Sequence, residues 1–398
     1  MDKKMYPVIS GAAERLRKLC FEALEDKFDD KEKEAAREYL EKELHALDLT
    51  GGHFIFLQIK ELMQKAGLRK YDVSIRGTAA GSMVAYLLDI SEVDPIKLDL
   101  KPETIYLNRL NREIDIDLNI PAGKYDAAHA LLKTLEGVGR AIDIEVDGEL
   151  AGTYLLPEDC DPSETLTIKK RPNGDEIVYY DSFFLLPQFY KADLKASVRM
   201  EVLSKLAERT GVDPADVPYY SDEVIAMFRS NEGGVSGSFI DLPDFASDRV
   251  KSMIRKLKPE SFDDLVKLFS LVHGTGVWED NGEKLFDENG IGIKELISDR
   301  DDISDYLLSL RIDRMKAFDI SEYIRKGKAL LKRPEWSEYK KVMLEAGAPE
   351  WYAGSCEKIK YLFPRAHAAA YMIKILRQAW YRLNYPEEYR IVAEKYEL

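Results

Sequence analysis

The pattern of hydrophobic residues changes twice along this 398-residue chain, and that change limits the fold more than any other feature. Residues 11–27, 31–47 and 54–66 carry apolar side chains at the spacing of amphipathic helices. Between about 72 and 194 the pattern becomes short alternating or β-branched runs, which are typical of strands. After Lys195 the pattern is again mostly helical. Because helices and strands are segregated rather than alternating, we predict an α+β fold.

The predicted strands are short, and the last of them follows a hairpin turn signal, Arg171-Pro-Asn-Gly174. We expect a mixed sheet at the centre, an N-terminal helical layer over it and an all-helical C-terminal part. The predicted strands are 71–75, 104–107, 113–118, 141–146, 152–156, 165–169 and 176–180. The predicted domains are 1–70, 71–196 and 197–398.

Composition narrows the possible partners and the cellular location. A net charge of −14 argues against a surface that wraps nucleic acid throughout. From Arg311 to Glu345, however, ten Lys and Arg stand against six Asp and Glu, which fits either a DNA track or a solvated helical face. The first ten residues lack a signal-peptide core, no stretch approaches a membrane span, and the three cysteines form no CxxC pair. We therefore expect a cytoplasmic protein with no membrane association.

An acidic run, Glu113-Ile-Asp-Ile-Asp-Leu118, is a candidate metal site. As a strand, it would place Glu113, Asp115 and Asp117 on one face. Carboxylates so close together repel one another, and a hard cation such as Mg²⁺ or Mn²⁺ would relieve the repulsion. From these residues alone, a solvated acidic face is the other interpretation.

A glycine-containing loop, Ser74-Ile-Arg-Gly-Thr-Ala-Ala-Gly-Ser82, follows a predicted strand and precedes a predicted helix. Glycine allows backbone N–H groups to approach an anion closely. The loop is not a Walker A motif, because it lacks Gly-Lys-Ser/Thr. It therefore fits either a phosphate cradle or a tight turn.

Near the C-terminus, Pro364 fits the start of a helix running from about Arg365 to Leu383, since proline is tolerated in the first turn. The amino end of a helix carries unpaired N–H groups and a partial positive charge. Arg365 and His367 beside it would make a strong phosphate site.

This last segment, Arg365-Ala-His-Ala-Ala-Ala-Tyr371, resembles the Lys-Ala-His-Ala-Ala-Ala-Tyr motif of the C-family bacterial replicative DNA polymerases, most closely the PolC-type DNA polymerase III alpha subunit. Other matches follow in the family's order, so the resemblance is specific. It implies a nucleotidyltransferase-like palm followed by helical fingers. The matches are His273-Gly-Thr-Gly-Val-Trp278, Arg300-Asp-Asp302, Arg325-Lys-Gly-Lys328 and Pro349-Glu-Trp-Tyr352.

The resemblance also implies which carboxylates hold the catalytic metals. The family's Pro-Asp-x-Asp-x-Asp-Phe corresponds here to residues 112–118, in which Arg112 and Glu113 replace the Pro and the first Asp, and this gives Asp115 and Asp117. Its Leu-Lys-Leu-Asp-Ile-Leu-Gly corresponds to Tyr190-Lys-Ala-Asp-Leu-Lys-Ala196, which gives Asp193. By resemblance, these three aspartates are catalytic and bind Mg²⁺ or Mn²⁺.

Two further sets of residues carry over from the family. Exposed lysines at helix ends are common, so the implied DNA-binding residues, judged without the resemblance, fit an ordinary solvent-exposed surface equally well. The implied nucleotide-binding residues are Arg76, Gly77, Gly81, Ser82, Arg140, Arg365, His367 and Tyr371. The implied DNA-binding residues are Arg325, Lys326, Lys328, Lys358 and Lys360.

The departures from the family shape the functional prediction. The stretch between Asp117 and Asp193 is too short for the family's thumb, and its zinc insertion and accessory domains have no counterpart. We predict a minimal PolC-like polymerase core that transfers a nucleotide from a dNTP to a primer 3′ hydroxyl by a two-metal mechanism. Its expected partners are primed DNA, dNTP and another replication protein that supplies grip on the duplex. The alternative is a catalytically inactive polymerase paralogue that binds nucleic acid or a replication partner.

Overall fold

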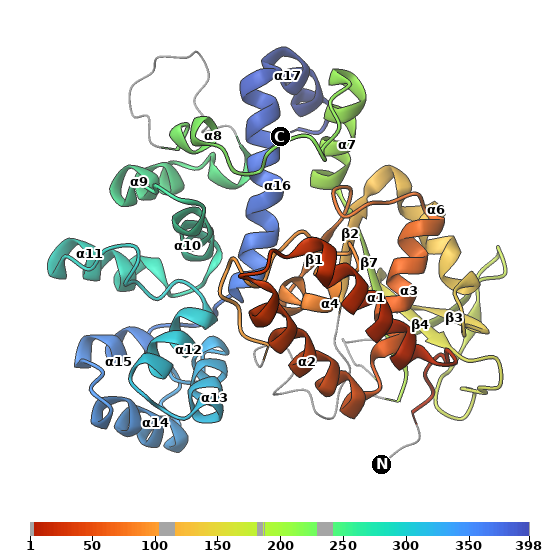
Figure 1. The fold of residues 1–398 in the computed structure, drawn as a ribbon, viewed down its shortest axis with the longest axis horizontal. Helices are drawn as coiled ribbons and strands as arrows, with labels where there is room; N and C mark the ends of the chain where they lie inside the picture. Colours follow the sequence, from red (N-terminus) through yellow and green to blue (C-terminus); the bar gives the residue numbers. More distant parts are fainter. Residues whose placement is uncertain (1–3, 103–115, 181–185, 187, 229–241, 398) are drawn as a thin grey trace. The chain divides into compact units, whose positions relative to one another are not determined.

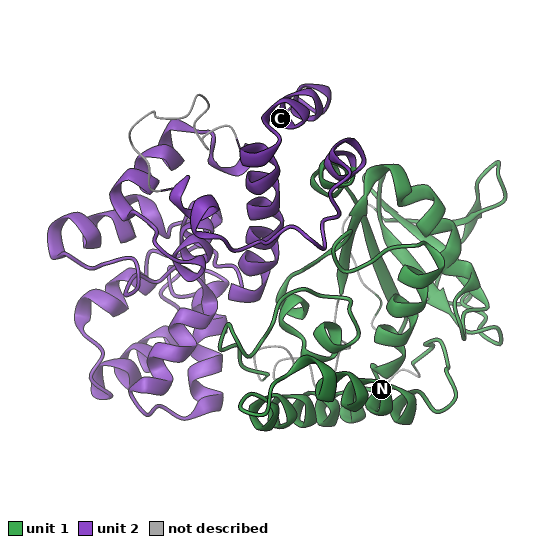
Figure 2. Cartoon of the chain, turned by 45° about the horizontal axis from the view of Figure 1, so that its top comes forward, with its two compact units in different colours: residues 1–204 green, residues 205–398 purple. Residues whose placement is uncertain are grey.

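The computed structural model describes residues 4–102, 116–180, 186, 188–228 and 242–397. The chain divides into two compact units, Met1–Ser204 and Lys205–Leu398 (Figure 2). Unit 1 contains the sheet and unit 2 is built mainly from helices, which confirms the predicted α+β class. The predicted strand 104–107 and the candidate ligand Asp115 lie outside the described residues.

Unit 1 begins with three helices, all of which were predicted (Figure 1). The first buries Leu16, Cys20 and Leu24 at helical spacing, so its apolar stripe faces the core. The second ends at Thr50 and is followed by Gly51, whose φ of 79° suits a glycine after a helix. The three helices are α1 Ala12–Lys27, α2 Lys33–Thr50 and α3 His53–Lys65, followed later by α4 Met83–Leu87 and α6 Tyr125–Leu131.

The described strands of unit 1 form a seven-stranded mixed sheet in the order β1-β2-β7-β4-β3-β6-β5. β2 pairs antiparallel with β1 and parallel with β7. The strand at 190–197 was absent from the predicted runs, and of the run predicted at 165–169 only Lys169 lies in a strand, the two-residue β5. The strands are β1 Ser74–Arg76, β2 Asp117–Pro121, β3 Arg140–Val146, β4 Glu149–Leu156, β5 Lys169–Lys170, β6 Glu176–Tyr180 and β7 Tyr190–Ser197.

The two faces of this sheet have different surroundings. On one face, Leu118 and Leu194 of the central strands line a small common cavity with Ile59 and Leu62 of α3. The other face carries an apolar cluster around Tyr154, with Phe189, Ile142 and their neighbours. Because successive strand residues alternate between faces, Asp117 and Asp193 point away from α3.

Unit 2 is organised around the long helix α16, whose residues Met372 to Ala379 are all buried. The helix begins directly after Pro364, as predicted, and ends one residue beyond the expected position. The described helices of this part are α7 Val198–Thr210, which crosses the unit boundary, α8 Asp222–Ala226, α9 Asp248–Leu257, α10 Phe262–His273, α11 Glu283–Asn289, α12 Arg300–Ser309, α13 Arg314–Arg325, α14 Pro334–Glu345, α15 Glu350–Cys356, α16 Arg365–Asn384 and α17 Pro386–Lys395. None of the helices in the described ranges has both the length and the apolar character needed to span a membrane.

Candidate active site

Three predicted site residues lie side by side across the sheet of unit 1. Arg76 of β1 is the register partner of Asp117 at the start of β2, and Asp117 is the register partner of Asp193 in the middle of β7. Directly opposite residues of paired strands point to the same face. An ion pair of 3.3 Å joins Arg76 Nη2 to Asp117 Oδ2. The structure therefore brings together residues that are far apart in the sequence.

Asp193 is buried and held between two lysines of its own strand. Lys191 donates to Asp193 Oδ2 at 2.6 Å, and the Nζ of Lys195 lies 3.0 Å from Oδ1. Burial alone would raise the pKa of the Asp193 carboxyl, but hydrogen bonding with Asp117 and the charges of Lys191 and Lys195 outweigh it and lower the pKa. The carboxyl is therefore held in its ionised, ligand-competent form.

The carboxylates of Asp117 and Asp193 supply part of the ligand set that a divalent cation would need. Asp193 Oδ1 is buried, and although Lys195 is at ion-pair distance, the oxygen has no aligned hydrogen-bond donor within the described residues. A buried carboxylate oxygen of this kind suits a hard cation. No group of three or more His, Cys, Asp or Glu in the described ranges is arranged to hold a metal ion. The third ligand predicted, Asp115, lies outside those ranges.

The glycine loop next to Arg76 is fastened to α2. Gly77 has φ 74° and ψ −161°, a conformation that glycine adopts far more readily than other residues. Buried Glu43 accepts hydrogen bonds from the Ser82 hydroxyl and, at 2.8 Å, from the backbone N–H of Met83. Tyr39 donates to the carbonyl of Gly81 at 3.0 Å. The predicted phosphate contacts of Gly81 and Ser82 stay predictions, but both residues are buried and bonded to α2.

Arg76 and Arg140 differ in position and in available donors. Arg76 is partly exposed, and its Nε has no hydrogen-bond partner among the described residues. Arg140 starts β3, which β7 and β4 separate from β2, and its Nη2 donates to Glu176 Oε1 at 2.9 Å. The structure thus keeps Arg76 beside the aspartates and does not bring Arg140 to them.

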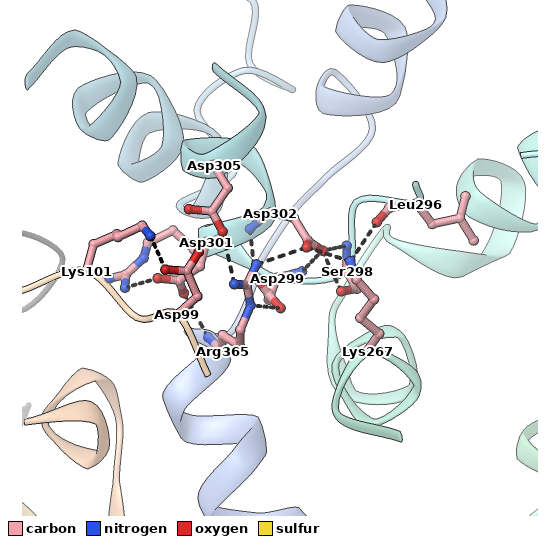
Figure 3. Close-up of polar contacts among 11 residues, drawn as sticks. Asp99, Lys101, Lys267, Leu296, Ser298, Asp299, Asp301, Asp302, Asp305 and Arg365 are labelled. Carbon is pink, nitrogen blue, oxygen red and sulfur yellow. Dashed lines mark hydrogen bonds and ion pairs between the residues drawn. The ribbon is translucent and has the colours of Figure 1, made fainter. Parts of the chain in front are cut away.

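In unit 2, Arg365 lies among aspartates (Figure 3). Its Nη1 donates to Asp305 Oδ2 at 2.9 Å, and its Nη2 donates to Asp302 Oδ1 at 3.1 Å. Its Nε is 3.5 Å from Asp299 Oδ2, and its backbone N–H donates to Asp301 at 2.8 Å. Phosphate binding by Arg365 stays a prediction, but a phosphate would have to compete with these carboxylates.

This aspartate cluster joins the starts of two helices of unit 2. Asp299 caps α12 and forms a capping box with Asp302. Burial, with added repulsion from Asp302, raises the pKa of Asp299 to about 7, and Arg365 offsets only part of the effect. Burial acts in the same direction on Asp302, but Lys267 and Arg365 outweigh it and lower its pKa. The ion pairs of Arg365 therefore hold the start of α16 against the start of α12.

His367 and Tyr371 lie on another face of α16, within a row of rings. Phe363 stacks on His367 with ring centroids 4.7 Å apart, and His367 lies 4.9 Å from Tyr371. Tyr371 in turn stacks on Phe269 of α10 at 5.6 Å. Residues four apart on a helix share a face, which explains the row. His367 and Tyr371, the two predicted nucleotide contacts on this face, therefore lie next to each other. They do not belong to the aspartate cluster around Arg365.

The predicted DNA-binding residues converge on one part of unit 2. The N–H of Leu362 donates to the Arg325 carbonyl at 3.2 Å, which places 325–328 beside 358–362. Gly327 has φ 68°, and a Cβ on it would lie 2.6 Å from the Lys360 carbonyl oxygen, so this close approach requires glycine. Lys326, Lys328, Lys358 and Lys360 are all exposed.

The buried Glu322 carboxylate pairs with cations of the loop at residues 325–328. It accepts two hydrogen bonds from Arg325, at 2.8 and 3.0 Å, and forms ion pairs with Lys326 at 3.0 Å and Arg300 at 3.4 Å. Burial alone would raise the pKa of the Glu322 carboxyl, but Arg325, Arg300 and Lys326 outweigh it and lower the pKa to about 2. The folded state of unit 2 therefore favours the ionised form of Glu322.

We expect the stabilisation from Glu322 to disappear in acid. A carboxyl with a lowered folded-state pKa stabilises the fold above its unfolded value and loses that contribution as pH falls from about 4.5 to about 2. The shift corresponds to about 3 kcal/mol at neutral pH. Denaturant melts of the wild type and Glu322→Gln should differ most at pH 7 and converge near pH 2. A gap that stayed constant with pH would contradict this assignment.

Sequence reasoning missed the residues that hold the candidate ligands in place. Glu43 is a buried acid in an amphipathic helix, and no local pattern links it to the loop at Ser82. The motif Arg300-Asp-Asp302 was matched, but nothing in its spacing identified Arg365 as its partner. Lys195 follows Asp193 by two residues, and strand alternation alone could have placed it on the same face.

Comparisons with known proteins show which family this chain resembles. A family model described as the bacterial DNA polymerase III alpha NTPase domain matches residues 14–152, and one described as the bacterial DNA polymerase III alpha subunit finger domain matches 197–347. The chain is similar to the PolC-type DNA polymerase III of Caldanaerobacter subterraneus, with 26% identity over 96% of this chain and 34% of the relative. The corresponding proteins of Clostridium perfringens and Bacillus subtilis are 28% and 26% identical over 98% and 96% of this chain and 33% of each relative. The chain spans about a third of the length of these curated relatives.

Proposed function

Because the chain belongs to the family of bacterial DNA polymerase III alpha subunits, we propose that it is a PolC-like polymerase core. It would transfer a nucleotide from a dNTP to the 3′ hydroxyl of a primer on a DNA template. The observation that carries the proposal is the row of Arg76, Asp117 and Asp193 on one face of the sheet. A basic group and two adjacent carboxylates are what nucleotidyl transfer requires in one place.

In the proposed site, Asp117 and Asp193 would hold Mg²⁺ or Mn²⁺, with Asp115 as the further ligand implied by the resemblance. When bound, the metal would activate the primer hydroxyl and neutralise charge on the triphosphate. Lys191 keeps the Asp193 carboxylate oriented through its 2.6 Å hydrogen bond. Arg76, a partly exposed cation beside Asp117, would bind a phosphate oxygen of the nucleotide.

For unit 2, we propose a contact with the DNA backbone through the exposed lysines at 326, 328, 358 and 360. Lysines bind phosphates without reading sequence, so this surface would position DNA rather than select it. Arg325 is held by Glu322 at 2.8 Å and would act mainly by shaping the loop. His367 and Tyr371 remain proposed nucleotide contacts on the basis of the resemblance. A replication protein that grips the duplex remains a proposed partner.

Primer extension tests this function directly. A short primed template, dNTPs and Mg²⁺ or Mn²⁺ at low salt should give extension products that EDTA removes. The variant with Asp117→Asn and Asp193→Asn together should give none. If the folded wild type gives no extension at high concentration, the proposal fails, and the inactive paralogue becomes the better interpretation.

A further inference from the structure

We infer that Lys195 is a built-in cation that competes with a divalent metal ion for Asp193 and so weakens metal binding by this chain. The inference rests on the proposed function, since it presumes that Asp117 and Asp193 hold a metal. It concerns a residue for which the family resemblance implies no role. In the matched motif Leu-Lys-Leu-Asp-Ile-Leu-Gly, Lys191 falls on the lysine, but Lys195 falls on the last leucine.

The geometry of β7 places this extra charge at the ligand. Lys191, Asp193 and Lys195 alternate along the strand and therefore share a face. The Lys195 Nζ is 3.0 Å from Asp193 Oδ1, while Oδ2 accepts from Lys191. Oδ1 is buried and has no aligned hydrogen-bond donor in the described ranges. The Lys195 ammonium therefore occupies the approach to the oxygen that is best suited to a metal.

The two lysines differ in how firmly they are held. The Lys191 side chain is 8% exposed and packs over Gly152. A Cβ added to Gly152 would lie 2.9 Å from the Cδ of Lys191. The Lys195 side chain is 33% exposed. Lys191 is therefore a fixed part of the site, whereas Lys195 can move its ammonium toward solvent. Only Lys195 can yield its place to an incoming cation without disturbing the sheet.

The charges explain the direction of the effect. Arg76, Lys191 and Lys195 place three positive charges beside the carboxyl groups of Asp117 and Asp193. A divalent ion entering this place is repelled by each ammonium that remains. Removing the partly exposed charge of Lys195 should strengthen metal binding on the order of tenfold, after allowance for solvent screening.

The test is a titration of the full chain with Mn²⁺ alone, without nucleotide or DNA, in which free Mn²⁺ is followed by electron paramagnetic resonance. Lys195→Leu and Lys195→Gln should bind on the order of tenfold more tightly than the wild type. The matched control is Lys205→Leu. Lys205 is also 33% exposed and is ion-paired, with Glu208 at 2.8 Å, but it lies on α7. This control should bind as the wild type does.

The outcomes separate the inference from the proposed function. If the Lys195 variants bind Mn²⁺ no more tightly than the wild type while Asp193→Asn abolishes binding, the inference is overturned and the metal site stands. If no variant shows saturable binding, both are overturned. Melting curves in EDTA establish that each variant is folded, and the glutamine variant keeps the test valid if leucine disturbs β7.

Discussion

Replacing Asp117 by asparagine should lower the rate of nucleotide incorporation on the order of a thousandfold or more. Asparagine keeps the size of the side chain but removes the negative charge beside Arg76 and Asp193. A neutral amide is a poorer ligand for a hard cation, so the metal would be held weakly or wrongly. Asp193→Asn should have an effect of similar size, because the two carboxylates are register partners.

Asp143→Asn is the matched control for these variants. Asp143 is also a buried aspartate of the same sheet, with a side chain 6% exposed, and it accepts a hydrogen bond from Arg171 at 2.6 Å. Its strand neighbour Thr153 pairs with Ala192, so Asp143 points to the face opposite Asp193. The control should lose stability but retain incorporation per folded molecule in a single-turnover assay. Equal rates for the Asp117 and Asp143 variants would refute the proposed site.

Replacing Arg365 by methionine should destabilise unit 2 by about 3 to 5 kcal/mol, as expected when one partner of a buried ionic network is removed. Methionine fills a similar volume but leaves Asp299, Asp302 and Asp305 without the guanidinium they surround. The remaining carboxylates would repel one another and take up protons more readily. The loss should therefore be smaller at pH 5 than at pH 8.

Tryptophan fluorescence measures this loss in unit 2 alone, because Trp278, Trp336, Trp351 and Trp380 are the only tryptophans of the chain. Urea melts followed in this way avoid treating two units as one transition. The control is Arg390→Met, since Arg390 also pairs with two acids but is 56% exposed. Its melting midpoint should barely change. A similarly small change for Arg365→Met would show that the network adds no stability.

Local patterns predicted most of the fold. The helices α1, α2 and α3 follow from their apolar stripes, and the start of α16 follows from Pro364. The pattern did not predict β7, although that strand carries Asp193. Its sequence contains Lys, Asp and Lys on one face, which lowers its hydrophobic signal, and it is stabilised by pairing with β2 and β4 rather than by its own propensity.

The candidate site was predictable only where a motif named the residue. Asp117, Asp193 and Arg76 came from matched motifs, and their common face depends on pairing between distant strands. The contacts of Arg365 were not predictable, because a helix amino end predicts an anion without saying whether the anion is a ligand or an aspartate of the same chain. Long-range electrostatic partners leave no periodic signal in a sequence.

The parallel pairing of β2 with β7 has a consequence for how such a chain can change length. The two strands that carry Asp117 and Asp193 are fixed side by side, and the chain between them leaves the end of one and returns to the start of the other. The entropic cost of closing the connection between the two strands grows only slowly as that connection becomes longer. A whole module could be gained or lost between these strands while the two carboxylates stay in register. This part of the sheet is therefore a natural place to graft a duplex-gripping domain.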